Sequence, residues 1–116
     1  DTNWTRDTPD KLSGTIAHGK SYPPDTVDYF GPAPQKAALL DGLLLCGLST
    51  TFLDHGLRFD ERFRFHFYDM DLCRTAAQKN LTCGTWPVSV IHESPGNFSG
   101  GEWQNAYAAY LEKWGD

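Results

Sequence analysis

The pattern of polar and hydrophobic positions changes after the first third of this chain. Five of the seven prolines lie within residues 1–38, where Gly14, Gly19 and Gly31 add further turn signals. Because proline and glycine interrupt regular backbone structure, we predict that residues 1–36 are mostly loop. A loop this long is uncommon inside a compact domain, so the segment is expected to serve a function or to pack onto something else.

A nearly continuous apolar run, AALLDGLLLCGL, follows at residues 37–48. A run of this length between Pro34 and Ser49 is typical of a strand that is buried on both faces. Asp41 and Gly42 interrupt the run. Since a buried carboxylate is costly unless it is paired or hydrated, Asp41 is expected to open onto a cleft or to find a partner.

Shorter patterns predict the elements between residues 49 and 79. Ser49 is a suitable N-cap for a short helix that ends at Gly56. Phenylalanines alternate with polar residues over 63–68, which predicts an extended segment with three phenyl rings on one face. Residues 69–79 begin with two acids and continue with an apolar stripe, so they are expected to form a helix.

The last part of the chain combines short strands with one more helix. Residues 82–92 are β-rich, and Pro87 places them at a sheet edge or a bulge. A loop is expected at 93–101 and an amphipathic helix at 102–114. The 116 residues suffice for a single small domain. We predict an α/β fold with a short mixed sheet, two or three helices, a long irregular N-terminal segment and a core region at 37–94.

Charge, hydropathy and cysteine content narrow the function classes. Fifteen acidic and ten basic residues give a net charge of -5, which argues against nucleic-acid binding. No apolar run approaches the roughly 20 residues of a transmembrane helix. Cys46, Cys73 and Cys83 form no CxxC pair and leave an odd thiol, so neither a disulfide framework nor a zinc site is expected. A cytoplasmic location is the simplest expectation.

Chemically reactive side chains are densest at His66, Asp69, Asp71, His92 and Glu93. Carboxylates at the start of a helix project from a rigid element, so they are well placed for proton abstraction or metal binding. Helix N-termini also favour acids for purely electrostatic reasons. The local spacing leaves both explanations of the two aspartates open.

Three motifs occur in a characteristic order within residues 37–94. An apolar segment with Asp-Gly is followed by GLRFDERF at 56–63, by FHFYDMDLCRTA at 65–76 and by GTWPVSVIHES at 84–94. This order resembles the acceptor half of family-two, GT-A-type glycosyltransferases. The resemblance implies a partial GT-A fold, which is Rossmann-like. Two departures are that Tyr68 stands where the family usually has glutamate, and that Arg74 follows Cys73 directly.

The resemblance implies a role for several residues. Asp69 matches the catalytic base, which deprotonates the acceptor hydroxyl for an inverting transfer. His92 matches the histidine that completes a Mn²⁺ or Mg²⁺ site when the donor site is complete. Substrate contacts are assigned to Asp41, Gly42, His66 and Asp71. The implied partners are a nucleotide-sugar and a sugar or glycan acceptor.

The nucleotide-binding half of such an enzyme has no counterpart in this sequence. A GT-A domain needs alternating strands and helices to hold the nucleotide, and residues 1–38 show no such alternation. We therefore expect that the chain alone lacks the donor site and does not catalyse transfer. It would be part of a longer enzyme with an N-terminal half, or pair with another chain.

Two other function classes remain open. The chain could be a non-catalytic module that binds carbohydrate or protein on a glycosyltransferase-like scaffold, with its exposed half-sheet covered by a second copy in a homodimer. A small metallohydrolase could use His66, Asp69, Asp71 and His92, although hydrolases normally present more closely spaced ligands.

Overall fold

The computed structural model describes residues 11–94 and 100–115 of the chain. Small sheets and helices are combined, in agreement with the predicted α/β class. The chain divides into two compact units. Of the described residues, the first comprises 11–37 and 84–94, and the second comprises 38–83 and 100–115.

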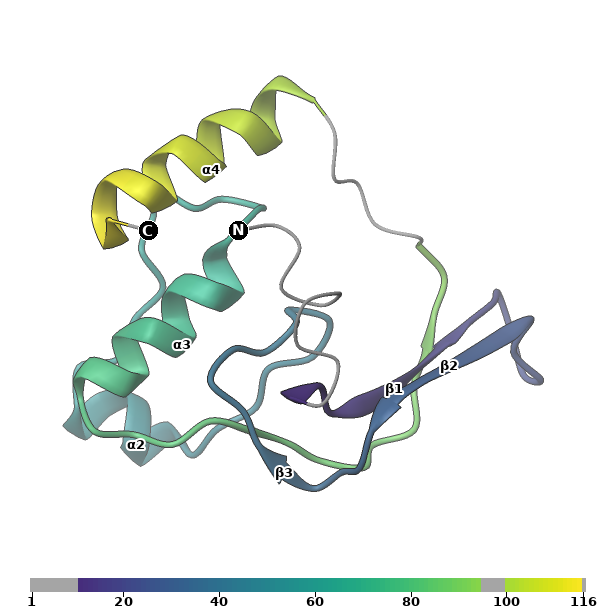
Figure 1. Ribbon diagram of the computed structural model, residues 1–116. Helices are drawn as coiled ribbons and strands as arrows, with labels where there is room; N and C mark the ends of the chain where they lie inside the picture. The colour runs from purple at the N-terminus through teal and green to yellow at the C-terminus, as the bar shows by residue number, and fades with distance from the viewer. Residues whose placement is uncertain (1–10, 95–99, 116) are drawn as a thin grey trace. The chain divides into compact units, whose positions relative to one another are not determined.

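A β-hairpin forms the centre of the first unit (Figure 1). Strand β1 (Gly14–His18) pairs antiparallel with β2 (Thr26–Gly31), and β5 (Ile91–His92) pairs parallel with the other edge of β1. The segment expected to be mostly loop therefore carries regular structure. A hairpin can form here because Pro23 lies in the connection between β1 and β2, where it removes no hydrogen bond of the strand pairing.

A second, two-stranded sheet belongs to the same unit. Strand β3 (Gln35–Lys36) pairs antiparallel with β4 (Gly84–Thr85), and the hydroxyls of Ser13 and Thr85 are 2.6 Å apart. The β-rich segment 82–92 thus contributes two short strands. Between them the N–H of Val88 donates to the carbonyl of Trp86 at 2.8 Å, which makes a tight turn around Pro87. Each of the two strands lies at the edge of its sheet, as Pro87 predicted.

Three helices lie in the described part of the second unit. They are α2 (Ser49–Asp54), α3 (Tyr68–Gln78) and α4 (Gly101–Trp114), each close to its predicted range. Helix α2 is followed by Gly56 in the left-handed conformation, φ 57°, as its C-terminal glycine suggested. Most of the loop predicted at 93–101 lies outside the described residues.

The core of the second unit is small. Leu57, Leu72 and Ala76 are buried together, and four partly buried residues pack against them, namely Leu45, Phe52, Leu81 and Cys83. Leu72 and Ala76 lie four residues apart on α3, so they share one face of that helix. The apolar stripe predicted for this helix is confirmed at these positions.

Two extended segments predicted for this unit are absent from it. Residues 38–48 contain no strand, and Leu43, Leu44 and Leu48 are exposed. The prediction was wrong because an apolar run is buried as a strand only where neighbouring strands cover it. Residues 63–67 are also irregular. Phe63 is 3% exposed and Phe65 is 67% exposed, so their rings do not share a face.

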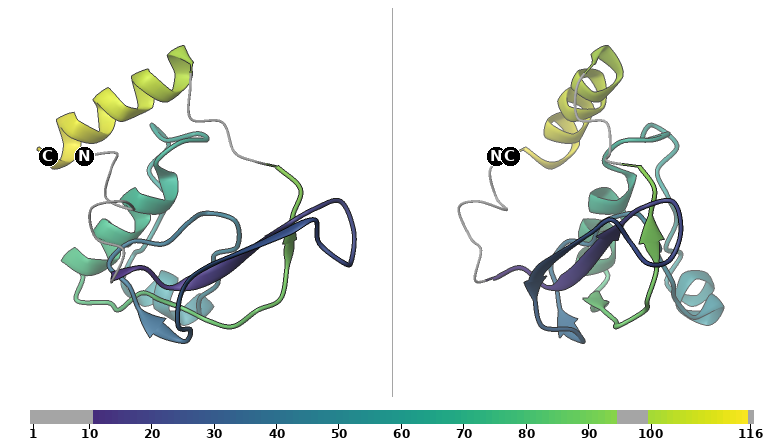
Figure 2. Two further views of the ribbon diagram at one scale, coloured as in Figure 1. Left: turned by 45° about the vertical axis from the view of Figure 1, so that its right-hand side comes forward. Right: turned by 90° about the vertical axis from the view of Figure 1, so that its right-hand side faces the viewer.

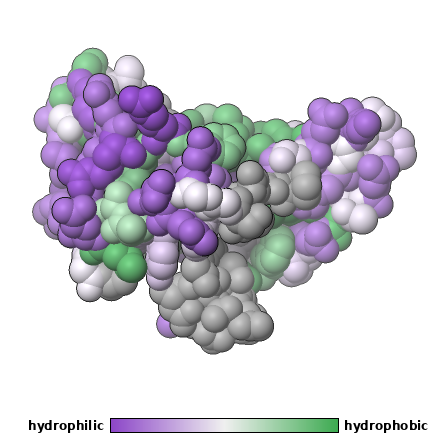
Figure 3. Space-filling model, turned by 90° about the horizontal axis from the view of Figure 1, so that it is seen from above, coloured by the Kyte–Doolittle hydropathy of each residue, from purple (hydrophilic) through white to green (hydrophobic). Residues whose placement is uncertain are grey.

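Helices α3 and α4 lie side by side, as Figures 1 and 2 show. The Arg74 guanidinium of α3 lies 4.6 Å from the centre of the Trp114 ring of α4. The Phe67 ring, directly before α3, lies 5.3 Å from the Tyr110 ring. The opposite face of α4 is largely hydrophilic, as seen at the left of Figure 3. The amphipathic helix predicted at 102–114 is thereby confirmed.

Within residues 11–94 and 100–115, none of the helices has the length and apolar character that a membrane crossing requires.

Candidate functional site

Asp69 occupies the first turn of α3 and is the centre of the candidate site. Its carboxylate accepts hydrogen bonds from the backbone N–H of Met70, at 2.8 Å, and from that of Gly42. The first N–H groups of a helix have no partner within the helix, so a carboxylate there finds ready donors. The side chain is partly buried. Asp69 is therefore held in a defined position and not left to move freely in solvent.

Gly42 brings the turn at residues 41–43 against the start of α3. The Tyr68 hydroxyl donates to the Gly42 carbonyl at 2.9 Å. A Cβ atom at Gly42 would overlap the Tyr68 hydroxyl and would lie 3.0 Å from the Asp69 carboxylate. The close approach of these two segments thus requires glycine at this position. The structure brings together Gly42 and Asp69, which lie 27 positions apart in the sequence.

Asp41 adds a second carboxylate to this site. Its Oδ1 atom accepts the Leu43 N–H at 3.1 Å, which stabilises the turn, and its side chain is exposed. The Asp41 carboxylate is therefore solvated and accepts a backbone N–H. This agrees with the expectation that it would not be buried without a partner. Its negative charge acts on Asp69 and Tyr68.

Burial raises the pKa of Asp69 above the usual value for an aspartate. The hydrogen bonds from Met70 and Gly42 oppose this increase, whereas the charge of Asp41 adds to it. Burial, followed by the charges of Asp69 and Asp41, likewise raises the pKa of Tyr68, so its hydroxyl stays protonated as a donor. A positioned carboxylate with a raised pKa has the properties of a general base.

Asp71 lies elsewhere, although it was assigned to the substrate contacts. It is 1% exposed, and its Oδ1 atom accepts the Trp114 indole N–H at 2.9 Å. The same oxygen lies 2.7 Å from the Lys113 ammonium, which also contacts Asp60 at 2.9 Å. Asp71 therefore connects α3 to α4 inside the second unit. These contacts give Asp71 a structural role, and its assignment to the substrate contacts stays a prediction.

His66 is half-buried shortly before α3. Its ring packs edge-on against the ring of Phe65, with 4.8 Å between the ring centres. This contact explains its position without a substrate. The structure places His66 near the start of the helix, but the carboxylate site is formed by Asp41, Gly42, Tyr68 and Asp69.

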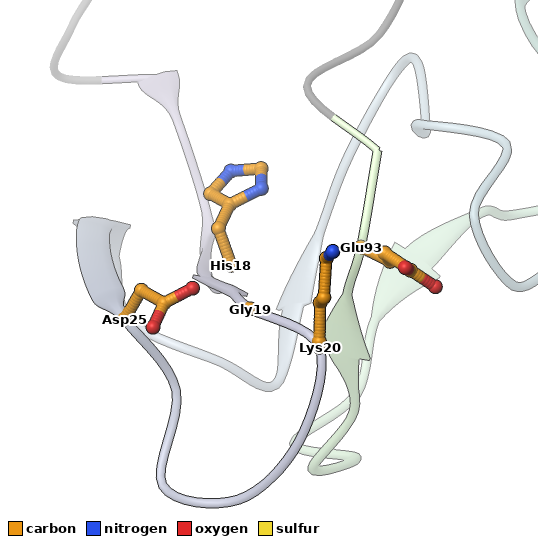
Figure 4. Close-up of a pocket in the computed structure, with 5 residues that line it drawn as sticks. All are labelled: His18, Gly19, Lys20, Asp25 and Glu93. Carbon is orange, nitrogen blue, oxygen red and sulfur yellow. The ribbon is translucent and has the colours of Figure 1, made fainter.

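His92 belongs to the first unit, where it ends β5. Its ring centre lies 5.5 Å from that of His18, and its carbonyl accepts the Gly19 N–H at 3.2 Å. A small pocket of mixed charge lies beside it, lined by His18, Gly19, Lys20, Asp25 and Glu93 (Figure 4). Lys20 and Asp25 come from the connection between β1 and β2, and Glu93 directly follows β5.

The residues that the structure describes do not form a complete metal site. Among 11–94 and 100–115, no three His, Cys, Asp or Glu side chains are grouped so that they could hold an ion. The His92 ring lies against the His18 ring, and His92 belongs to no such group. The divalent metal implied by the resemblance therefore stays a prediction that needs ligands from elsewhere.

Comparisons with protein-family models, with curated proteins and with solved structures found no match for this chain. The glycosyltransferase resemblance accordingly rests on the sequence pattern at 37–94, and the chemistry of Asp69 rests on the geometry around it.

Tyr68 is the site residue whose role the sequence indicated least. Its hydroxyl joins the turn at Gly42 to α3 over a separation of 26 residues. The signal available in the sequence was the departure itself, since a tyrosine stands where the motif usually has glutamate. A phenol donates one hydrogen bond to a carbonyl, which an ionised carboxylate cannot do.

Proposed function

We propose that this chain is the acceptor half of an inverting glycosyltransferase that uses a nucleotide-sugar, with Asp69 as its general base. The observation that best supports this proposal is the state of the Asp69 carboxylate. It is held by two backbone N–H groups, and burial and the charge of Asp41 raise its pKa. A base with a raised pKa binds a proton more tightly, which favours its transfer from a hydroxyl group.

In the proposed reaction, the acceptor hydroxyl oxygen attacks the anomeric carbon of the donor sugar. A new bond from carbon to oxygen forms on one face, while the bond to the diphosphate oxygen breaks on the other face. The diphosphate leaves with the electron pair, and Asp69 takes the hydroxyl proton. A positioned base of this kind contributes roughly 10²–10⁴-fold to a rate.

Asp41 and Gly42 are proposed to contact the acceptor sugar next to Asp69. The exposed Asp41 carboxylate has oxygen lone pairs that remain available for sugar hydroxyls after its bond to Leu43. Gly42 has no side chain, which lets the turn approach the Tyr68 hydroxyl and the Asp69 carboxylate closely. The assignment explains why a glycine and a carboxylate interrupt an apolar run.

The donor is proposed to bind outside the described residues. The first unit consists of short β-pairings, whereas nucleotide binding in the GT-A fold uses alternating strands and helices. The described residues offer His92 alone toward the implied Mn²⁺ or Mg²⁺ site, so no step of the proposal uses a metal. We accordingly expect no sugar transfer by the 116-residue chain alone.

Substitution of Asp69 by asparagine tests the base. In the longest natural reading frame that contains this chain, Asp69→Asn should reduce transfer by about 10²–10⁴-fold with little loss of acceptor binding. The matched control is Asp54→Asn, which neutralises an exposed carboxylate at the end of α2. If Asp69→Asn transfers sugar at the rate of the control, the proposed role of Asp69 is wrong.

Calorimetric titration tests the missing donor site. UDP-sugars and GDP-sugars with Mn²⁺ should give no binding heat with the isolated chain. Tight binding would show that the chain holds a donor site of its own, which would refute this part of the proposal.

Exposed aromatic rings in the first unit favour a second candidate function, a carbohydrate-binding module without catalysis. Tyr29 is 72% exposed and Trp86 is 75% exposed. An aromatic ring can cover the apolar face of a sugar at little entropic cost. For such a module, Trp86→Ala should weaken glycan binding and Asp69→Asn should leave it unchanged. Neither the natural protein nor the Asp69→Asn variant should transfer sugar.

A further inference from the structure

Two of the three cysteines approach each other at the C-terminal end of α3. Cys73 lies inside the helix, and the chain reverses after Gln78. Asn80 has a left-handed φ of 58° and its N–H donates to the Ala77 carbonyl, while the Leu81 N–H donates to the Ala76 carbonyl at 2.9 Å. This hydrogen-bond pattern is the Schellman motif, which ends a helix and sends the chain back along it.

The length of the returning segment matches the length of the helix that it follows. From Cys73 to Lys79 the helix rises about 9 Å, at about 1.5 Å per residue. From Asn80 to Cys83 an extended chain covers about 10 Å, at about 3.3 Å per residue. Cys83 therefore returns to the level of Cys73.

The side chains confirm this placement. Cys83 packs against the cluster that contains Leu72 and Ala76, which flank Cys73 on α3. The Cys83 thiol is close enough to raise the pKa of Cys73, whereas the Leu40 backbone N–H lowers it. The sulfur atoms are thus neighbours in a part of the protein that is already packed, which keeps the entropic cost of linking them small.

We propose that Cys73 and Cys83 form an intrachain disulfide by exchange with a small-molecule disulfide, and that this bond ties the segment after α3 to the helix. The Cys83 thiolate attacks the oxidant, forms a mixed disulfide and releases one thiol. The Cys73 thiolate then attacks the Cys83 sulfur and releases the second thiol. Two cysteine thiols are oxidised, and one disulfide of the oxidant is reduced to two thiols.

Exposure sets the order of these steps. Cys83 is partly exposed, whereas Cys73 is 2% exposed, so the oxidant reaches Cys83 first. Burial and the neighbouring Cys83 raise the pKa of Cys73 to about 11. The second step is therefore slow near neutral pH and becomes faster as the pH rises, because only the thiolate attacks.

The proposal does not rest on the proposed glycosyl transfer, but it bears on the same part of the fold. Cys73 follows Asp69 by four residues, so the two side chains lie on one face of α3. The Leu40 N–H that contacts Cys73 directly precedes Asp41. The disulfide would hold α3, the helix that carries Asp69, next to the segment that contains Leu40 and Asp41.

Mass spectrometry of the full chain tests the proposal. The Cys46→Ser variant removes the third, exposed thiol. Folded protein treated with oxidised glutathione at pH 9 should lose two hydrogen atoms, and peptide mapping should place the bond between Cys73 and Cys83. Oxidation should raise the melting temperature by roughly 10 °C, and a reducing agent should reverse the change.

The control adds Cys83→Ser to this variant. It should gain no intrachain bond and no thermal shift, while its circular dichroism shows whether it is folded. If both thiols of the folded Cys46→Ser protein still react with an alkylating reagent after oxidation has reached equilibrium, the proposal is refuted. Bond formation that occurs only after denaturation would refute it as well, and neither result depends on the variant with Cys83→Ser.

Discussion

Replacement of Lys113 by methionine should destabilise the second unit through the buried Asp71. The Lys113 ammonium lies 2.7 Å from the Asp71 carboxylate, and Asp71 is 1% exposed. Methionine retains much of the length and apolar volume of the lysine stem but carries no charge. The substitution therefore removes the ion pair and leaves a charge in the core.

The magnitude follows from the burial of the two partners. Breaking a fully buried pair costs about 3–5 kcal/mol, while an exposed pair contributes about 1 kcal/mol or less. Lys113 is 25% exposed, and the Trp114 indole still donates to Asp71 after the change. We therefore expect a loss of about 2–3 kcal/mol in the free energy of unfolding, between these two limits.

Urea denaturation of a double-mutant cycle is the appropriate assay. Lys113→Met, Asp71→Asn and the double variant are compared at one pH and one salt concentration. The double variant should be more stable than Lys113→Met, because its core no longer contains an unpaired charge. Lys36→Met, at an exposed lysine of β3, serves as a surface control.

Two results would refute this reasoning. One is a loss below about 0.5 kcal/mol for Lys113→Met, which is the range of ordinary surface substitutions. The other is additivity of the two single substitutions, since it would show that the lysine and the aspartate do not act on each other.

Three further predictions concern the site and its surroundings. Asp41→Asn should lower the pKa of Asp69 toward the usual value of about 3.9, as measured by carboxyl-carbon NMR, because a repelling charge is removed. Gly42→Ala should cost about 1–3 kcal/mol in urea unfolding, since the new methyl group overlaps the Tyr68 hydroxyl. The hydrogen bond from Lys113 lowers the pKa of Asp60, so this pair stabilises the protein above about pH 4 and is lost as the pH falls through the lowered value. Asp60→Asn should therefore make the free energy of unfolding less dependent on pH at acidic pH, in the acid limb of its pH profile.

Matched variants separate these effects from general damage. Asp54→Asn changes an exposed carboxylate and should leave the pKa of Asp69 and the acid limb unaltered. Gly101→Ala adds a methyl group at a glycine with open space around it, so it should not destabilise the protein. An unchanged pKa of Asp69 in Asp41→Asn would show that the two carboxylates do not interact. A Gly42→Ala variant as stable as Gly101→Ala would contradict the close approach of the turn to α3.

The helices were predictable from the sequence because their signals are local. Acids at the start and an apolar stripe predicted a helix at 69–79, and α3 spans Tyr68–Gln78. Spacing of aromatic residues likewise predicted α4, which spans Gly101–Trp114. Backbone hydrogen bonds within a helix join residues four apart, so a short window of sequence contains the relevant information.

The strands were less predictable because they depend on distant partners. The apolar residues 37–48 fit a buried strand, yet residues 38–48 of the second unit lie in turns and irregular backbone with exposed leucines. The hairpin of β1 and β2 lies among prolines that predicted loop. Pairing between residues far apart decides both cases, and a local pattern does not reveal it.

The amino-acid sequence by itself indicated the helices α2, α3 and α4, the edge position of the strands on either side of Pro87 and the position of Asp69 at a helix start. The tertiary structure decided the surroundings of the two neighbouring acids Asp69 and Asp71. Asp69 faces the turn at Gly42, whereas Asp71 is buried against Trp114. Residues two apart on a helix point in different directions, so their surroundings depend on what packs against each face.

The tertiary structure also decided the relation between Cys73 and Cys83. Their spacing gave no sign of a pair, but the reversal at Asn80 brings the two thiols into contact. A chain reversal converts a separation along the sequence into proximity in space. For this reason, the carboxylate site and the cysteine pair appear only when the chain is folded.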